Sequence, residues 1–130
     1  MGIKVQVPKS ILITLNQLFE LERKLNKADD SSGLGRNITK IKDAFREEGL
    51  PLNIGGVERR LTFAYEDPTG EPFNETRSDL DASISGSGTD NLVVVEVIKP
   101  VIRYILNDQS GMCSKIIQKG IVIVESQKGK

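Results

Sequence analysis

Apolar residues near the start of the chain recur with the period of an α-helix. Ser10 is a suitable N-cap, and the positions that follow it carry a stripe with spacings of four, three and seven residues, formed by Ile11, Leu15, Leu18 and Leu25. Polar and charged residues occupy the opposite side. The pattern predicts an amphipathic helix that ends at 29–33, where Asp, Ser and Gly compete with helical hydrogen bonds.

A second helical pattern follows after a short connection. Ile38, Ile41 and Phe45 share one side of it, and Gly49 is a natural stop. Two amphipathic helices with a short connection predict an antiparallel hairpin. Its apolar stripes require cover, either from the rest of the chain or from a second copy. In the second case the dimer interface is Ile11, Leu15, Leu18 and Leu25.

Beyond Pro51 the pattern changes to that of strands and turns. Asn53, Gly55 and Gly56 are typical of a linker, and 58–65 alternates as a half-exposed or edge strand. Ala82 and Ile84 predict a short strand. The β-branched runs 93–98 and 116–124 predict two longer strands, joined by a loop through Asn107, Asp108, Ser110 and Gly111.

These elements predict an α+β fold. The helical hairpin occupies residues 1–50 and serves as a dimerisation bundle, and residues 51–130 form a small, mostly antiparallel β-domain that binds a partner. A strand pair alone is unstable in water, so the remaining chain must supply cover and further strands. The order of the segments 51–60 and 105–114 is left open at this level.

Composition restricts the class of partner. The chain of 130 residues has 18 Lys and Arg against 18 Asp and Glu. A formal net charge of zero disfavours nucleic acid or an anionic membrane as the main partner. The sequence lacks both an apolar run of membrane-spanning length and the apolar centre of a signal peptide. We therefore expect a cytoplasmic protein that acts through protein contact.

The residue types that carry chemistry are scarce. The chain contains no His and a single cysteine, Cys113, so a zinc site, a disulfide within the chain and the commonest general base are all disfavoured. We predict no catalysis, metal or cofactor. An acidic cluster comprises Asp67, Glu71, Glu75, Asp79 and Asp81. Its spacing fits no calcium-binding loop, so we interpret it as a solvated turn. A small enzyme that uses these carboxylates is the weakest alternative.

Several short motifs resemble GrpE, the nucleotide exchange factor of DnaK-type chaperones. The segment 67–74, DPTGEPFN, resembles the family's Asp-Pro-x-Gly-x-Pro-Phe-Asp at the entry to its β-domain. Residues 93–99 resemble its Val-x-x-Val-x-Gln-Lys strand, and 115–124 are similar to its last strand. Leu21-Glu22-Arg23 is similar to part of its Asn-Leu-Glu-Arg-Ala-Leu helix.

The resemblance implies a homodimer with a four-helix bundle and a β-domain that acts as a wedge against the nucleotide-binding domain of a DnaK-type chaperone. Such a protein promotes ADP release through contact and performs no catalysis. By position, the partner-binding residues that the resemblance implies are Phe73, Lys99, Lys115 and Val124.

Departures from the family motifs support a second hypothesis. Leu80-Asp81-Ala82 stands where the family has His-Glu-Ala, and Lys99-Pro100-Val101 stands where it has Lys-Gly-Tyr. The family's long paired helix has no counterpart before Ile11. The alternative is a diverged, non-catalytic interaction or adaptor module that keeps a GrpE-like fold and binds a different protein.

Overall fold

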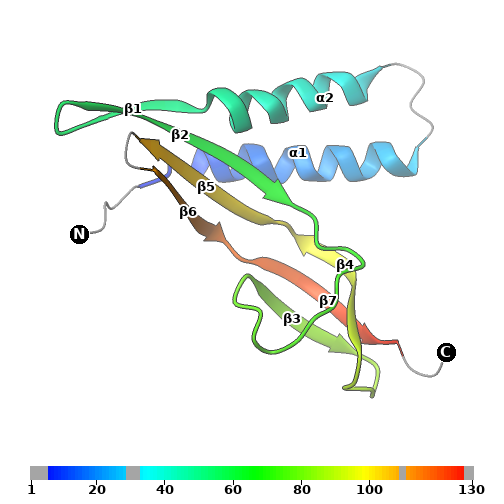
Figure 1. Ribbon diagram of the computed structural model, residues 1–130. Coiled ribbons are helices and arrows are strands. Elements are labelled where there is room, and N and C mark those ends of the chain that lie inside the picture. The colour runs from blue at the N-terminus through cyan, green and yellow to red at the C-terminus, as the bar shows by residue number, and fades with distance from the viewer. Residues whose placement is uncertain (1–5, 29–32, 109–110, 128–130) are drawn as a thin grey trace.

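Helices precede strands in the chain. The computed structural model describes residues 6–28, 33–108 and 111–127. Helix α1 spans Lys9–Lys27 and helix α2 spans Leu34–Asp43, and α2 continues into a short π-helical segment, η1, at Ala44–Glu48. The strands follow, and Figure 1 shows both helices along one side of the sheet region. The predicted α+β class is confirmed.

The described residues form seven strands in two sheets. The first sheet has the order β1-β2-β5-β6 and is antiparallel throughout; its strands are β1 (Leu50–Ile54), β2 (Val57–Glu66), β5 (Val101–Asp108) and β6 (Gly111–Gln118). The second has the order β3-β7-β4, with β3 (Leu80–Ser85), β7 (Gly120–Ser126) and β4 (Leu92–Lys99). Here β4 is antiparallel to β7, whereas β3 is parallel to it.

One long two-stranded ribbon connects the sheets. Only Pro100 separates β4 from β5, and only Lys119 separates β6 from β7, so both arms of the ribbon change sheet at the same level. Proline cannot donate to the strand ladder, which favours a break there. The Gln118 side chain donates to the Pro100 carbonyl oxygen at 2.9 Å and exchanges amide hydrogen bonds with Asn16, which attaches α1 to the break.

The loop predicted through Asn107, Asp108, Ser110 and Gly111 is wrong for the described residues among them. Asn107 and Asp108 lie in β5, Gly111 begins β6, and Ser110 lies outside the described residues. The strand continues because its buried residues alternate, and Leu106 is the last of that series to be buried; the other members are Ile102 and Tyr104. The run 116–124, predicted as one strand, instead belongs to two strands, β6 and β7, which are separated by Lys119.

The linker predicted at Asn53, Gly55 and Gly56 is instead the end of a strand and its hairpin turn. Pro51 lies in β1, an edge strand, where a missing N–H is tolerated, and β1 pairs with β2 in a hairpin. The Asn53 side-chain oxygen accepts a hydrogen bond from the Gly56 N–H at 3.1 Å across its turn. Because β1 covers one side of it, β2 is an inner strand with buried Leu61 and Phe63, and the predicted edge position is wrong.

The ends of the helical region follow local chemistry. Helix α1 begins at Lys9 after Pro8, so Ser10 lies in the first turn and the predicted N-cap is wrong. Proline suits the start of a helix because the first amides have no intrahelical acceptor. At the other end Gly49 has a φ of 59° and stops η1, as predicted.

Both helices contribute to the hydrophobic core beneath them. The first cluster joins the helices to the first sheet and contains Leu15, Leu18, Ile38, Leu61, Phe63, Ile102, Tyr104 and Leu106. The second is formed mainly by the three-stranded sheet and contains Phe19, Leu80, Val94, Val97, Val101, Val122 and Val124. Because Leu15, Leu18 and Phe19 all come from α1, this helix packs against both clusters.

Candidate protein-docking surface

An apolar groove lies between α1 and α2. Its volume is about 410 Å³, and it is lined by Leu18, Leu21, Lys24, Leu25, Ala28, Leu34, Asn37, Ile38 and Ile41. Leu18 and Ile38 are buried and also belong to the first core cluster. The floor of the groove is therefore the outer side of a packed core, which holds its shape.

The groove exposes large aliphatic side chains close together. Leu34 is 55% exposed, Leu21 is 49% exposed and Ile41 is 44% exposed. Single apolar residues on a surface are ordinary, whereas a contiguous apolar patch is typical of a binding site. We call Leu21, Leu34 and Ile41 the groove walls.

The edges of the groove carry positive charge. Lys24 lines it from α1, and Lys40 lies on α2 one turn after Asn37, which also lines it. Both lysines are exposed, and neither forms an ion pair with another residue that the structure describes. On the same helices Glu20 pairs with Arg23 at 2.9 Å. The groove is thus apolar inside and basic at its edges.

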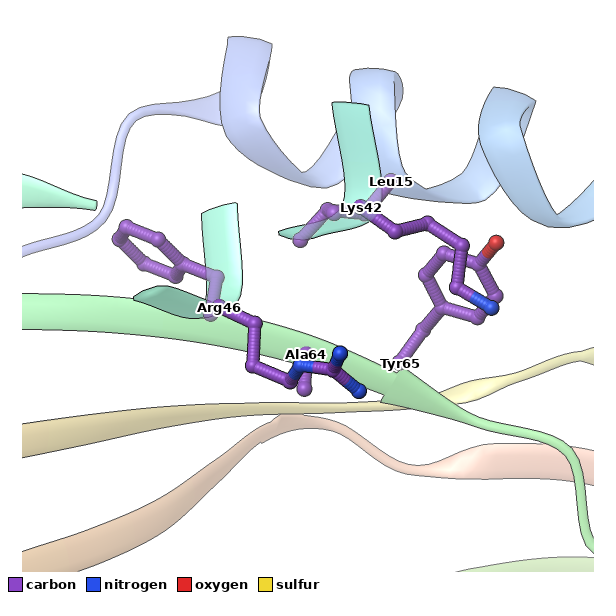
Figure 2. A pocket seen from close by; sticks show the side chains of 6 residues that line it. Leu15, Lys42, Arg46, Ala64 and Tyr65 are labelled. Carbon is purple, nitrogen blue, oxygen red and sulfur yellow. The ribbon is translucent and has the colours of Figure 1, made fainter. Parts of the chain in front are cut away.

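A polar cluster beneath the groove holds the two helices on the sheet. Lys42 donates to Glu22 at 2.9 Å, and the Tyr65 hydroxyl donates to the same carboxylate at 2.9 Å. The Lys42 ammonium also lies 4.8 Å from the centre of the Tyr65 ring, as Figure 2 shows. These contacts join α1, α2 and β2. Burial, with a further contribution from Glu22, raises the pKa of Tyr65 above its usual value, so the hydroxyl keeps its proton.

The pocket at this cluster is small. It has a volume of about 70 Å³ and is lined by Leu15, Lys42, Arg46, Phe63, Ala64 and Tyr65 (Figure 2). Drug-sized ligands occupy pockets of several hundred Å³. The cavity therefore has room for a few water molecules, and its residues serve to attach the helices.

A second cleft contains one of the predicted partner-binding residues. Lys99 lies where α1 meets the end of β4, in a cleft of about 260 Å³ that it shares with Pro100 and with the exposed Ile13 and Ile98. Lys115 is also exposed, on β6 opposite Tyr104, but it does not line this cleft. The cleft is also lined by Asn16, Gln17 and Glu20, so its surface combines apolar, polar, basic and acidic side chains.

The other two predicted partner-binding residues are packed inside the chain. Val124 is 0% exposed and Phe73 is half-buried against the same second core cluster. The Phe73 N–H donates to the Leu92 carbonyl oxygen at 2.8 Å, which closes the preceding loop on β4. In this conformation Val124 has no surface to offer a partner.

The residues predicted for a dimer interface lie against the sheet of the same chain. Leu15 and Leu18 are buried there, while Ile11 and Leu25 are half-buried against the same cluster. Of these four residues, Leu18 and Leu25 also line the groove. The intramolecular alternative accounts for the burial of this stripe. The exposed large apolar side chains of the two helices lie at the groove walls and at Ile13.

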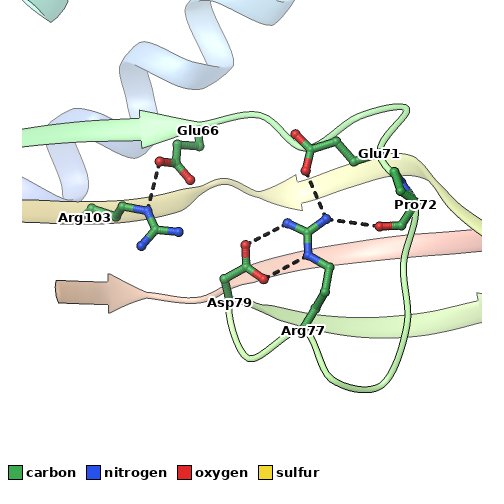
Figure 3. A network of polar contacts seen from close by, with 6 residues as sticks. All are labelled: Glu66, Glu71, Pro72, Arg77, Asp79 and Arg103. Atoms are coloured by element: carbon green, nitrogen blue, oxygen red, sulfur yellow. Dashed lines mark hydrogen bonds and ion pairs between the residues drawn. The ribbon is translucent and has the colours of Figure 1, made fainter. Parts of the chain in front are cut away.

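Arg77 pairs with two carboxylates of the acidic cluster. Figure 3 shows the Arg77 guanidinium between two carboxylates, donating to Asp79 at 2.7 and 3.1 Å and to Glu71 at 3.0 Å. The hydrogen bonds from Arg77 lower the pKa of Asp79 below its ordinary value. Asp67 accepts from Thr69. No three potential metal ligands converge anywhere in the described parts of the chain. Asp67, Glu71 and Asp79 thus hold the segment between β2 and β3 through contacts within it.

The sequence did not predict the groove. Leu21 and Ile41 were visible as apolar residues in their helices, but periodicity does not say which members of a stripe the sheet will cover. The width of the apolar arc on α1 could have indicated the groove. Besides the main stripe this arc includes Leu12, Phe19 and Leu21, so it is wider than packing against a single neighbour requires.

Comparisons with protein-family models, with curated proteins and with solved structures found no match to this chain. Neither of the described helices combines the length and the apolar content that crossing a membrane requires.

Proposed function

We propose that this protein is a non-catalytic interaction module of the cytoplasm. In this proposal α1 and α2 form a helical hairpin on a β-domain, and the groove between them binds another protein. The observation that carries the proposal is the set of exposed groove walls, Leu21, Leu34 and Ile41, around a buried floor. Covering these side chains removes apolar surface from water, which is the main favourable contribution to association.

The lining of the groove favours a protein partner over a small molecule. Lys24 and Asn37 are its polar side chains, and both lie beside aliphatic ones. Sites for small molecules are mostly apolar as well, but they enclose most of the ligand surface, whereas the groove walls here are about half exposed. An apolar channel between two helices instead fits the apolar face of a further helix, which inserts its side chains at intervals of three and four residues.

Capture experiments with matched variants test this function. The tagged protein is used to capture proteins from a lysate of its own source, beside Leu21→Asp and Ile84→Asp. Leu21 and Ile84 are almost equally exposed, at 49% and 48%, but Ile84 lies on β3 away from the groove. We expect a specific partner with the wild type and with Ile84→Asp, and its loss with Leu21→Asp, because a charge in the groove must be desolvated. Equal capture by the three proteins would refute the groove as the docking site.

A GrpE-like exchange factor is the second candidate, and the cleft around Lys99 supports it. A wedge that opens a chaperone requires an exposed basic and apolar surface, which Lys99 offers together with Ile13 and Ile98. It accelerates ADP release only if it binds the open chaperone more tightly than the closed one. Nucleotide must then weaken the binding of the wedge by the same factor.

The release rate of a fluorescent ADP analogue from a DnaK-type chaperone tests the second candidate. We expect acceleration by the wild type and by Leu21→Asp, and its loss when Lys99 and Lys115 are both replaced by Ala. This result would place the wedge outside the groove. A release rate that a saturating amount of folded protein leaves unchanged would rule out exchange activity, and the interaction module would remain.

A further inference from the structure

The partner of the groove can be described more closely, and this inference rests on the proposed function. We infer that the groove between α1 and α2 binds an amphipathic helix whose apolar face is flanked by acidic side chains. Three features of the described residues support it: the length of the groove, the charges at its edges and the pairing of the acidic residues on the same helices.

The length of the groove sets the size of the bound segment. On α1 its lining extends from Leu18 to Ala28, and on α2 from Leu34 to Ile41. A stretch of ten residues along a helix is about 15 Å long at roughly 1.5 Å per residue. A partner helix of about three turns therefore fills the groove, with apolar side chains that pack between Leu21 on one wall and Ile41 on the other.

The charges at the edges select the flanks of that helix. Lys24 stands at the α1 edge and Lys40 follows Asn37 on the α2 side, both exposed. Within the described residues of α1 and α2 the acidic side chains are already engaged, since Glu20 pairs with Arg23, Glu22 with Lys42, and Asp43 with Arg46. The described helices therefore present uncompensated positive charge on both sides of an apolar channel. Acidic residues beside the apolar face of a partner helix complement it.

The same charges disfavour a second copy of this chain as the occupant. A two-fold pairing of grooves sets the lysines of one copy near those of the other. Like charges brought together at an interface oppose association and act against the wrong partner. A homodimer through this face is therefore the competing occupant, and the experiment below distinguishes it.

A displayed peptide library tests the inference. Each peptide is an 18-residue helix with leucines at intervals of three and four residues, and its flanking positions encode Glu, Lys or Gln in equal amounts. We expect selection on the wild-type protein to enrich Glu at the flanks. A selected peptide should then bind about tenfold more weakly to the double variant Lys24→Glu, Lys40→Glu, and also more weakly at high salt.

Controls separate charge placement from total charge and from unfolding. The double variant Lys9→Glu, Lys119→Glu changes the net charge equally at two exposed positions that do not line the groove, and should keep the wild-type affinity. Circular dichroism verifies that each variant is folded. Leu21→Asp should abolish binding of the selected peptide.

Three results would overturn the inference. The first is equal enrichment of Glu and Lys at the flanking positions. The second is that every selected peptide binds the Leu21→Asp variant as tightly as the wild type. The third is that the wild type sediments as a dimer and the Leu21→Asp variant as a monomer. If the capture experiment still shows a partner that depends on Leu21, the proposed function stands and only the acidic helix is wrong. If capture also fails, both are wrong.

Discussion

Replacing Gly49 by Ala should destabilise the protein by about 3 kcal/mol or more, because the new methyl group meets backbone and the residue is held in a left-handed conformation. Gly49 has a φ of 59°. A Cβ at this position would lie 2.0 Å from the Leu61 carbonyl oxygen and 2.8 Å from the Leu61 carbonyl carbon. Strand β2 would have to move, and Leu61 belongs to the first core cluster. Urea unfolding followed by circular dichroism measures the loss.

Gly55→Ala is the matched control for that substitution. Gly55 has nearly the same φ, 60°, but a Cβ there meets no atom within 4 Å. It should cost about 1 kcal/mol, which is the penalty of the left-handed conformation alone. Because Gly49 also has a ψ of −140°, outside the left-handed helical region, the difference between the two variants measures the clash with β2 together with this less accessible backbone conformation. Equal losses would show that η1 and β2 are not in close contact at Gly49.

Leu18→Asp should unfold the protein, whereas Leu21→Asp should leave it folded. Leu18 is only 4% exposed and belongs to the first core cluster, so its replacement buries an unpaired carboxylate and removes a packed side chain. We expect a loss of several kcal/mol, of the order of the whole stability of a small domain. Leu21 is half exposed, and the corresponding change should cost about 1 kcal/mol or less. Thermal unfolding followed by circular dichroism compares the variants.

This comparison also separates the two readings of the α1 stripe. If the stripe served only as a dimer interface, Leu18→Asp would give a folded monomer of half the wild-type mass. If Leu18 belongs to the core of its own chain, the variant loses helical signal at room temperature. A folded, monomeric Leu18→Asp protein would contradict the packing of α1 on the first sheet.

Local sequence patterns were sufficient to predict much of the helical region. The stop at Gly49 follows from the tolerance of glycine for positive φ, and the two helical patterns follow from apolar residues at intervals of three and four. The strands at 93–98 and 82–84 were visible because β-branched and alternating residues favour extended backbone. The α+β class came from the order of these patterns along the chain.

Other features of the chain required contacts between distant segments. Asn107 looks like a loop residue but lies in β5, because the pairing of β5 with β2 and β6 outweighs its local preference. Pro51 looks like a break, yet an edge strand accommodates it. The parallel pairing of β3 with β7 and the change of sheet at Pro100 also leave no local pattern, because pairing joins residues far apart in sequence.

Some features of the candidate site likewise follow from the sequence, whereas others depend on the tertiary structure. The sequence by itself determined that α1 and α2 are amphipathic, that the chain lacks the residue types of most catalytic and metal sites, and that Lys24 and Lys40 lie in helices. Only the tertiary structure decided that the sheet covers Leu18 and leaves Leu21 exposed, although they are three residues apart on one helix. Periodicity specifies a face, but the position of the neighbouring sheet and helix decides which edge of that face remains open to a partner.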